Sequence, residues 1–354
     1  MTELNEFLKK LVSMPGLSAY EDPVRDVIRE EWQPLVDEIN ISKVGSLHGL
    51  RRASTPGKHP SILLAANMDA IGLMVTAIDD GWIKGMAIGG LDLRILPGQP
   101  VTVHGQRDLP GILQMTPDRL RPKSSAGSPP KVLELFVDVG LSPREVNRLV
   151  KIGDLISFSQ PPLEMAGEVM AGHSMDNRAS VAALTVCLEE IRRFNLEWDV
   201  WAVATVQEEV TLAGAKTSAF EIKPDLAVAV DVTFAKGPGS TDYRAFPLGK
   251  GPTIGVGANN HPALVERFKA TAEEMDMPYS IEYSPRNSGT DAMAMQITAE
   301  GIPCAVLGIP LRYMHTPLEM VTLKDIKRAG RLLARFIINL EADSMDKIFA
   351  ESKA

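Results

Sequence analysis

Four apolar segments of strand length each run into polar residues that are capable of chemistry. In chain order they are SILLAANMD at 61–69, VWAVATVQEE at 200–209, DLAVAVDVT at 225–233 and IPCAVLGIP at 302–310. Continuous apolar runs of this length, ending in small and polar residues, are typical of buried strands. The pattern therefore predicts a sheet whose strands are covered on both faces.

Segments with helical spacing of apolar residues lie before, between and after these strands. They cover 3–13, 23–35, 177–194, 261–276 and 322–340. Strands that alternate with helices indicate an α/β fold with a largely parallel sheet between two helical layers. In such sheets, ligands bind beyond the carboxyl ends of the strands, which is where the polar residues fall.

The region from 73 to 164 differs from the rest of the chain in its composition and its pattern of apolar residues. It contains short β-like pieces separated by Gly and Pro, together with the stretch RPKSSAGSPPK at 121–131, whose composition is typical of a flexible linker. We therefore predict a β-rich domain at 73–164, inserted into an α/β domain formed by 1–72 and 165–354.

Charge and cysteine content limit the binding partners and the cellular compartment that can be expected for this chain. The 37 basic and 45 acidic residues give a formal net charge of -8, which disfavours nucleic acid as a partner. Cys187 and Cys304 lie inside apolar runs and are predicted to be buried thiols, as expected in a reducing compartment. Neither a secretory signal nor a run of roughly 20 apolar residues is visible. We expect a cytoplasmic protein with no membrane partner.

Polar residues that could form a metal site recur where these strands end or a helix begins. They are Asn67 with Asp69, Asp176, Glu208 with Glu209, Asp231 and His315. A single Asp or His in such a place is usually a helix cap, a turn residue or a surface residue. Carboxylates and an imidazole at one edge of a sheet, however, are the donors that hold one or two divalent ions such as zinc, cobalt or manganese.

The neighbours Glu208 and Glu209 are informative as a pair. Two adjacent carboxylates repel each other unless a cation or separate roles divide them. One could bind an ion while the other accepts a proton from a metal-activated water. A solvated turn with no partner is the alternative interpretation of the same residues.

Six ordered motifs resemble a known family. The runs MDAIGLMV, GHSMDNRAS, TVQEEVTLAGA, AVDVT, SGTDAMAMQ and IPLRYMHTPLEMV are similar, in order and spacing, to the TET-type aminopeptidases of metallopeptidase family 42. That family includes relatives labelled deblocking or glutamyl aminopeptidases or endoglucanases. The resemblance covers nearly the whole chain. It implies an α/β domain of the zinc-exopeptidase type, an inserted PDZ-like dimerisation domain, and dimers that build a tetrahedral dodecamer.

The resemblance also implies roles for the candidate ligands. Asp176 would bridge two metal ions. Glu209 and His315 would bind one of these ions, and Asp231 would bind the other. The implied cofactor is one or two divalent ions per chain, with zinc or cobalt favoured and manganese as a further possibility.

Glu208 and Asp69 would act on the reaction without binding the ion. By the resemblance, Glu208 is the general base and Asp69 orients a ligand from outside the metal site. The chain departs from the family at Asn67, where the family motif Ala-His-Met-Asp supplies a ligand histidine. Because an amide oxygen is a neutral and weaker donor, Asn67 is expected to leave the ion held with Asp231 poorly bound.

Three functions can be weighed on these residues. The first is a metallo-aminopeptidase that removes N-terminal residues from short peptides. The second is a catalytically impaired or mononuclear homologue, suggested by Asn67, that serves as a peptide-binding or assembly protein. The third is a glycosidase, which needs two carboxyl groups about 5 to 10 Å apart on either side of the scissile bond. Metal chemistry explains the sequence neighbours Glu208 and Glu209 better.

Overall fold

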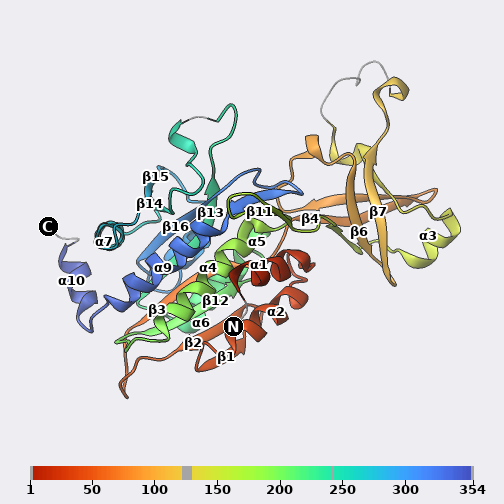
Figure 1. The fold of residues 1–354 in the computed structure, drawn as a ribbon. Coiled ribbons are helices and arrows are strands. Elements are labelled where there is room, and N and C mark those ends of the chain that lie inside the picture. Colours follow the sequence, from red (N-terminus) through yellow and green to blue (C-terminus); the bar gives the residue numbers. More distant parts are fainter. Residues whose placement is uncertain (1–2, 122–129, 241, 352–354) are drawn as a thin grey trace.

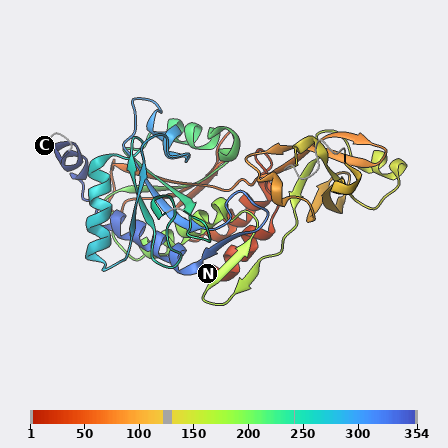
Figure 2. The ribbon, with the colours of Figure 1, turned by 90° about the horizontal axis from the view of Figure 1, so that it is seen from above.

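The computed structural model describes residues 3–121, 130–240 and 242–351. A layered α/β body carries a smaller β-rich lobe at one end, and the two are separate masses in both views (Figure 1, Figure 2). Most of the linker-like stretch predicted at 121–131 lies outside the described residues, which exclude 122–129.

The body is built on a mixed sheet of eight strands. Their order is β1-β2-β12-β3-β13-β16-β14-β15. The bounds are β1 Glu38–Ile41, β2 Leu47–Arg51, β3 Ser61–Asn67, β12 Asp199–Thr205, β13 Leu226–Phe234, β14 Thr253–Gly257, β15 Ser280–Ser284 and β16 Cys304–Leu311. The central strands β12, β3, β13 and β16 run parallel. These four are the apolar segments read from the sequence, so the predicted α/β fold is confirmed.

Helices cover both faces of this sheet because its strands alternate their buried side chains (Figure 1). Along β3, Ile62 and Leu64 pack into the larger core, whereas Leu63 and Ala65 pack into the smaller one. The larger core includes α1 Leu4–Ser13, α2 Asp22–Trp32, α4 Met175–Ile191, α7 Pro262–Glu274 and α9 Leu323–Ile338. The smaller core includes α6 Ala213–Ile222 and α8 Ala292–Gln296. Two further helices are α5 Glu208–Thr211 and α10 Ser344–Glu351.

The lobe is a closed barrel with its own core. The barrel order is β4-β5-β8-β7-β6-β9, with bounds β4 Gly72–Asp79, β5 Trp82–Ile88, β6 Gln99–His104, β7 Asp108–Met115, β8 Leu135–Asp138 and β9 Leu155–Phe158. Helix α3 (Pro143–Leu149) adds Val146 to that core. Short 3-10 helices lie at Leu93–Ile95, Asp118–Leu120, Val132–Glu134 and Asp242–Arg244. The domain limits 73–164 and the PDZ-like, dimerising nature of the barrel stay predictions.

A small sheet returns the chain from the barrel to the body. Its strands are β10 Leu163–Met165, β11 Val169–Gly172 and β17 Glu319–Thr322, in the order β10-β11-β17. Strand β11 leads into α4, and β17 leads into α9. The register places Gly172 opposite Glu319, so the start of α4 lies beside a buried glutamate.

Two further expectations concern cysteines and membranes. Cys187 and Cys304 are buried and free, as predicted. Over the ranges that the structure describes, no helix has both the length and the apolar character needed to cross a membrane.

Candidate metal centre

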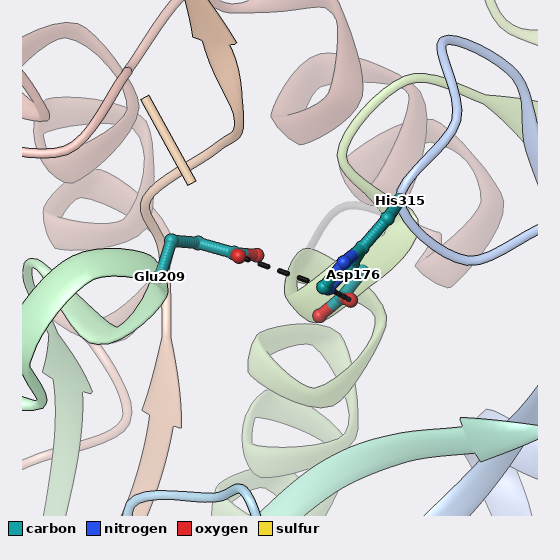
Figure 3. Close-up of side chains that lie close together, drawn as sticks. All are labelled: Asp176, Glu209 and His315. Carbon is teal, nitrogen blue, oxygen red and sulfur yellow. Dashed lines mark ion pairs between the residues drawn. The ribbon is translucent and has the colours of Figure 1, made fainter. Parts of the chain in front are cut away.

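Asp176, Glu209 and His315 come together although they lie on three separate elements (Figure 3). The Nε2 atom of His315 is 3.5 Å from Asp176 Oδ2 and 3.8 Å from Glu209 Oε2. One candidate ligand atom from each residue lies within 4.8 Å of the other two. Ligands about 2.0 to 2.2 Å from a common zinc ion have separations in this range. The three residues therefore fit one divalent ion.

The backbone is bent sharply at each part of this triad. Ser174, Gln207 and His315 adopt positive φ angles of 60°, 57° and 61°. Residues other than glycine rarely adopt this left-handed conformation, and such strain concentrates at functional sites. The turns at Ser174 and Gln207 lie directly before the helices that carry Asp176 and Glu209.

Glu319 joins two members of the triad and was not recognised from the sequence. Its Oε2 accepts a hydrogen bond from the Asp176 backbone N–H and its Oε1 accepts one from the His315 backbone N–H, each at 2.9 Å. Burial, followed by the charge of Asp176, raises the pKa of Glu319 well above its usual range. A carboxylate that fixes the ligands from outside is a regular part of a metal site. The available signal was an acidic residue inside the short apolar run LEMV.

Asp69 is fully buried beneath the Glu208-Glu209 pair. Its Oδ1 accepts the backbone N–H of Glu208 at 3.1 Å, and its Oδ2 accepts the N–H of Glu209 at 3.2 Å. Ser18 donates a third hydrogen bond, at 2.6 Å, to Oδ2. Asp69 thus accepts the backbone N–H groups of the first turn of α5, which have no partner within the helix. These hydrogen bonds fix the backbone positions from which the side chains of Glu208 and Glu209 enter the site.

The centre holds more negative charge than its own cations can balance. Burial raises the pKa of both Glu208 and Glu209 to about 11, with further contributions from Asp231 at Glu208 and from Asp176 at Glu209. Burial and the charge of Asp176 also raise the pKa of Asp231. Carboxylates crowded in this way hold protons unless a cation neutralises them, and a divalent ion replaces those protons. The donor set therefore fits a metal.

Asn67 is 1% exposed and lies at the end of β3. Its Nδ2 donates to Asp69 Oδ1 at 3.3 Å, and its Oδ1 accepts a hydrogen bond from Asn177 Nδ2 at 2.8 Å. Asp231 lines a cavity with Asp176 and Glu209, but Asn67 does not line that cavity. The ligand set that the sequence suggested for a second ion, with Asn67 and Asp231, therefore stays a prediction.

Asp291 is a second buried acid that sequence reasoning left without a role. Its Oδ2 accepts a hydrogen bond from Thr205 Oγ1 at 2.5 Å, whereas its Oδ1 has no partner among the described residues. Burial raises the pKa of Asp291 to about 7, and its charge contributes to the raised pKa of Glu208. The signal was its place in the SGTDAMAMQ motif.

The site opens into a cavity of about 240 Å³. The cavity is lined by Asp176, Glu208, Glu209, Asp231, Val232, Thr233, Phe234, Glu282, Ser288, Gly289, Thr290, Met314 and His315. The connection between β5 and β6 packs closely against His315. A Cβ atom at Gly90 would lie 2.7 Å from His315 Nδ1, and Asp92 donates its backbone N–H to the His315 carbonyl. Glycine at position 90 therefore leaves room for the candidate ligand His315.

Comparisons with known proteins agree with this architecture. The family model described as M42 glutamyl aminopeptidase matches residues 49–332. The lysyl aminopeptidase of Pyrococcus furiosus is 34% identical over 95% of this chain and 97% of its own length.

Solved structures of aminopeptidases are also similar to this chain. An aminopeptidase from the archaeon Desulfurococcus kamchatkensis has a TM-score of 0.90 and 35% identity, covering 98% of this chain and 97% of its own. The TET1 peptidase of Pyrococcus horikoshii has a TM-score of 0.81 and 29% identity, covering 96% and 100%. With the family model matching most of its length, this chain belongs to the M42 family of peptidases and is an enzyme of the aminopeptidase class.

Proposed function

We propose that this enzyme is a metal-dependent aminopeptidase that removes N-terminal residues from short peptides. The observation that carries the proposal is the triad of Asp176, Glu209 and His315 beside Glu208, in a cavity of an M42 fold. A glycosidase is disfavoured, because Glu208 and Glu209 are adjacent residues of one short helix, whereas a glycosidase needs two carboxyl groups on either side of the scissile bond. An impaired peptide-binding homologue has only Asn67 in its favour among the features described.

Zinc or cobalt is the expected ion, with manganese as a further candidate, and Asp176, Glu209 and His315 would hold it. When bound, the ion supplies Lewis acidity to the scissile carbonyl and to the attacking water. Glu319 keeps the backbones of Asp176 and His315 in place through its two hydrogen bonds. The backbone of Glu209, the third member of the triad, is held by Asp69, which accepts its N–H.

Glu208 is the proposed proton carrier. Its carboxylate lines the cavity, and Asp69 holds its backbone N–H. It would take a proton from the attacking water and deliver that proton to the leaving amine. The free amine of the substrate would lie among the remaining carboxylates of the cavity, such as Asp231.

We further propose that the protein is a homo-oligomer built from dimers, with a tetrahedral dodecamer as the expected form. The TET1 peptidase of Pyrococcus horikoshii is described as assembling into a tetrahedron or a large octahedral shell. The barrel formed by β4 to β9 projects from the α/β body, and we expect subunit contacts on this projecting lobe (Figure 2).

Removal of the metal is expected to abolish hydrolysis of short peptides, and added zinc or cobalt should restore it. The released N-terminal amino acid can be quantified by chromatography. An N-acetylated copy of the same peptide is the matched control, and it should remain intact because it lacks a free amine. Hydrolysis that survives exhaustive chelation, or cleavage of the acetylated peptide, would contradict the proposal.

Asn67→His is expected to raise the metal content toward two ions per chain. A neutral imidazole can keep the hydrogen bond to Asp69 through Nδ1–H and present Nε2 as a ligand atom. Calorimetric titration with zinc or cobalt counts the sites. Asn67→Ala is the control, because it removes the amide without adding a nitrogen donor. The same number of sites in Asn67→His and wild type would show that position 67 is not a ligand position.

A further inference from the structure

A second cavity, of about 370 Å³, lies between the barrel and the α/β body. The body lines it with the segment 12–17, at the end of α1, and the barrel lines it with residues of β6, β7 and β9. None of the described residues that line it also lines the cavity of the candidate metal centre. Its volume lies in the usual range of small-molecule sites, about 300 to 1,000 Å³. The second cavity can therefore hold a small ligand apart from the metal centre.

Three adjacent strands of the barrel place a serine, a histidine and an aspartate in this cavity. His104 ends β6 and pairs with Asp108, which begins β7. Ser157 lies in β9 and pairs with Thr102, two residues before His104. Because side chains alternate between the two faces of a sheet, Ser157, His104 and Asp108 share one face. All three line the cavity.

A chain of hydrogen bonds joins these three side chains. His104 Nε2 lies 2.8 Å from Ser157 Oγ, and His104 Nδ1 lies 2.8 Å from Asp108 Oδ1. Since an ionised carboxylate can only accept, Asp108 favours the neutral tautomer that carries its proton on Nδ1. Nε2 then accepts the serine O–H. In this arrangement a histidine acts as the base that activates a serine as a nucleophile.

The three side chains differ in their exposure to solvent. Ser157 is 7% exposed and reaches solvent only through the cavity that it lines, whereas the side chain of Asp108 is 71% exposed. A ligand of Ser157 would therefore lie within the cavity, and Asp108 would orient the imidazole from the rim. Because water screens an exposed charge, the contribution of Asp108 is expected to be small.

The walls of the cavity suit a small uncharged ligand. Leu17, Phe158 and Pro161 are among the apolar residues that line it. Among the described lining residues, Asp108 is the single acid, and lysine and arginine are absent. A short carboxylic ester matches these walls, because it has an apolar body and no charge.

His173 in the cavity wall is a second, independent indication of a ligand. It is 5% exposed, and neither of its ring nitrogens has a hydrogen-bond partner among the described residues. A buried polar group without a partner is rare in folded proteins and is frequently explained by a bound group or a catalytic role. The wall of this cavity therefore has hydrogen-bonding capacity that the chain itself does not use.

We propose that this cavity is a second active site, in which Ser157 hydrolyses small uncharged carboxylic esters independently of the metal centre. Ser157 Oγ bonds to the carbonyl carbon of the ester, and its proton passes to His104 Nε2. His104 gives that proton to the departing alcohol as the ester C–O bond breaks, which leaves an acyl group on Ser157. Water then attacks this acyl group with His104 as base, and the carboxylic acid is released as the serine O–H is restored.

Diisopropyl fluorophosphate tests the nucleophile in the wild-type, metal-loaded enzyme. Ser157 Oγ would displace fluoride from phosphorus, and mass spectrometry of peptides would locate the added group. Ser159 is the internal control, because it lines the same cavity and is more exposed but is not the serine bonded to His104. We expect Ser157 to react about 10²-fold faster than Ser159, the lower limit of the usual contribution of a positioned base. Equal rates, or no label on Ser157, would overturn the proposal.

Hydrolysis of p-nitrophenyl acetate tests the catalysis. Ser157→Ala and His104→Gln should each lower kcat/KM about 10²-fold. Asp108→Asn should lower it by less than about 5-fold, because the carboxylate is exposed. Ser159→Ala is the matched control and should hydrolyse the ester at the wild-type rate. An unchanged rate in Ser157→Ala would assign the ester hydrolysis to other groups and refute the second site.

Peptide hydrolysis by the same preparations separates the two sites. Ser157→Ala, loaded with zinc or cobalt, should cleave a short peptide at the wild-type rate, which also shows that the variant is folded. Loss of peptide hydrolysis in a variant with the circular dichroism spectrum of the wild type would refute the independence of the two sites. If Ser157→Ala does not fold, the labelling of the wild-type enzyme still decides whether Ser157 is an activated nucleophile.

Discussion

Glu208→Gln is expected to lower kcat about 10²- to 10⁴-fold, the usual contribution of a positioned general acid-base group. The amide has nearly the same shape but cannot accept and return a proton. The backbone N–H of residue 208 would still donate to Asp69, so the loop geometry should persist. Turnover of a short peptide and metal content by mass spectrometry should be measured on the same preparation.

The metal content decides how this result is interpreted. We expect it to be unchanged, because Glu208 is not part of the triad of Asp176, Glu209 and His315. Glu209→Gln is the matched comparison on the neighbouring residue and should lower metal content as well as activity. A loss of metal in Glu208→Gln would assign Glu208 as a ligand, and unchanged turnover would remove it from the mechanism.

Arg178→Met is expected to destabilise the fold by about 3 to 5 kcal/mol, the usual effect of removing one partner from a buried charge network. Arg178 is fully buried, and its guanidinium donates to the carbonyls of Leu11, Met14 and Met68. Burial lowers its pKa to about 10, so it remains a cation at neutral pH. Methionine has a similar length but would leave those carbonyls without donors.

Urea denaturation at fixed protein concentration measures this effect, because oligomerisation shifts apparent stability. Arg331→Met is the control. Arg331 forms an ion pair with Glu190 but is 59% exposed, so its loss should change stability by less than about 1 kcal/mol. Equal unfolding midpoints for the two variants would show that the buried Arg178 does not hold α1 and α4 together.

Local patterns in the sequence were sufficient for the central part of the fold. Strands β3, β12, β13 and β16 are continuous apolar runs because both of their faces are buried. The helices α4 and α9 kept their predicted places to within a few residues. The edge strands were not predicted. β1 and β15, for example, are short and partly exposed, so burial leaves no continuous apolar signature in them.

The candidate triad could also be proposed from the sequence. Asp176, Glu209 and His315 stand at element ends, and their motifs resemble a known family. The structure brings their ligand atoms within 4.8 Å of one another. The closed order of the six-stranded barrel depends on pairing between strands distant in sequence, such as β4 with β9, and no local pattern encodes that pairing.

The groups that hold and extend the site were decided only by tertiary structure. Glu319 accepts a hydrogen bond from the backbone N–H of Asp176, which is 143 residues away in the sequence. Asn177 donates a hydrogen bond to the side-chain oxygen of Asn67, which is 110 residues away. Glu282 meets Thr233 through a space left by Gly308 on another strand. Periodicity along a chain reports which face of one element is buried, since burial acts on each element separately. A hydrogen bond between distant elements leaves no period, so these contacts became visible only once the sheet and its helices were packed together.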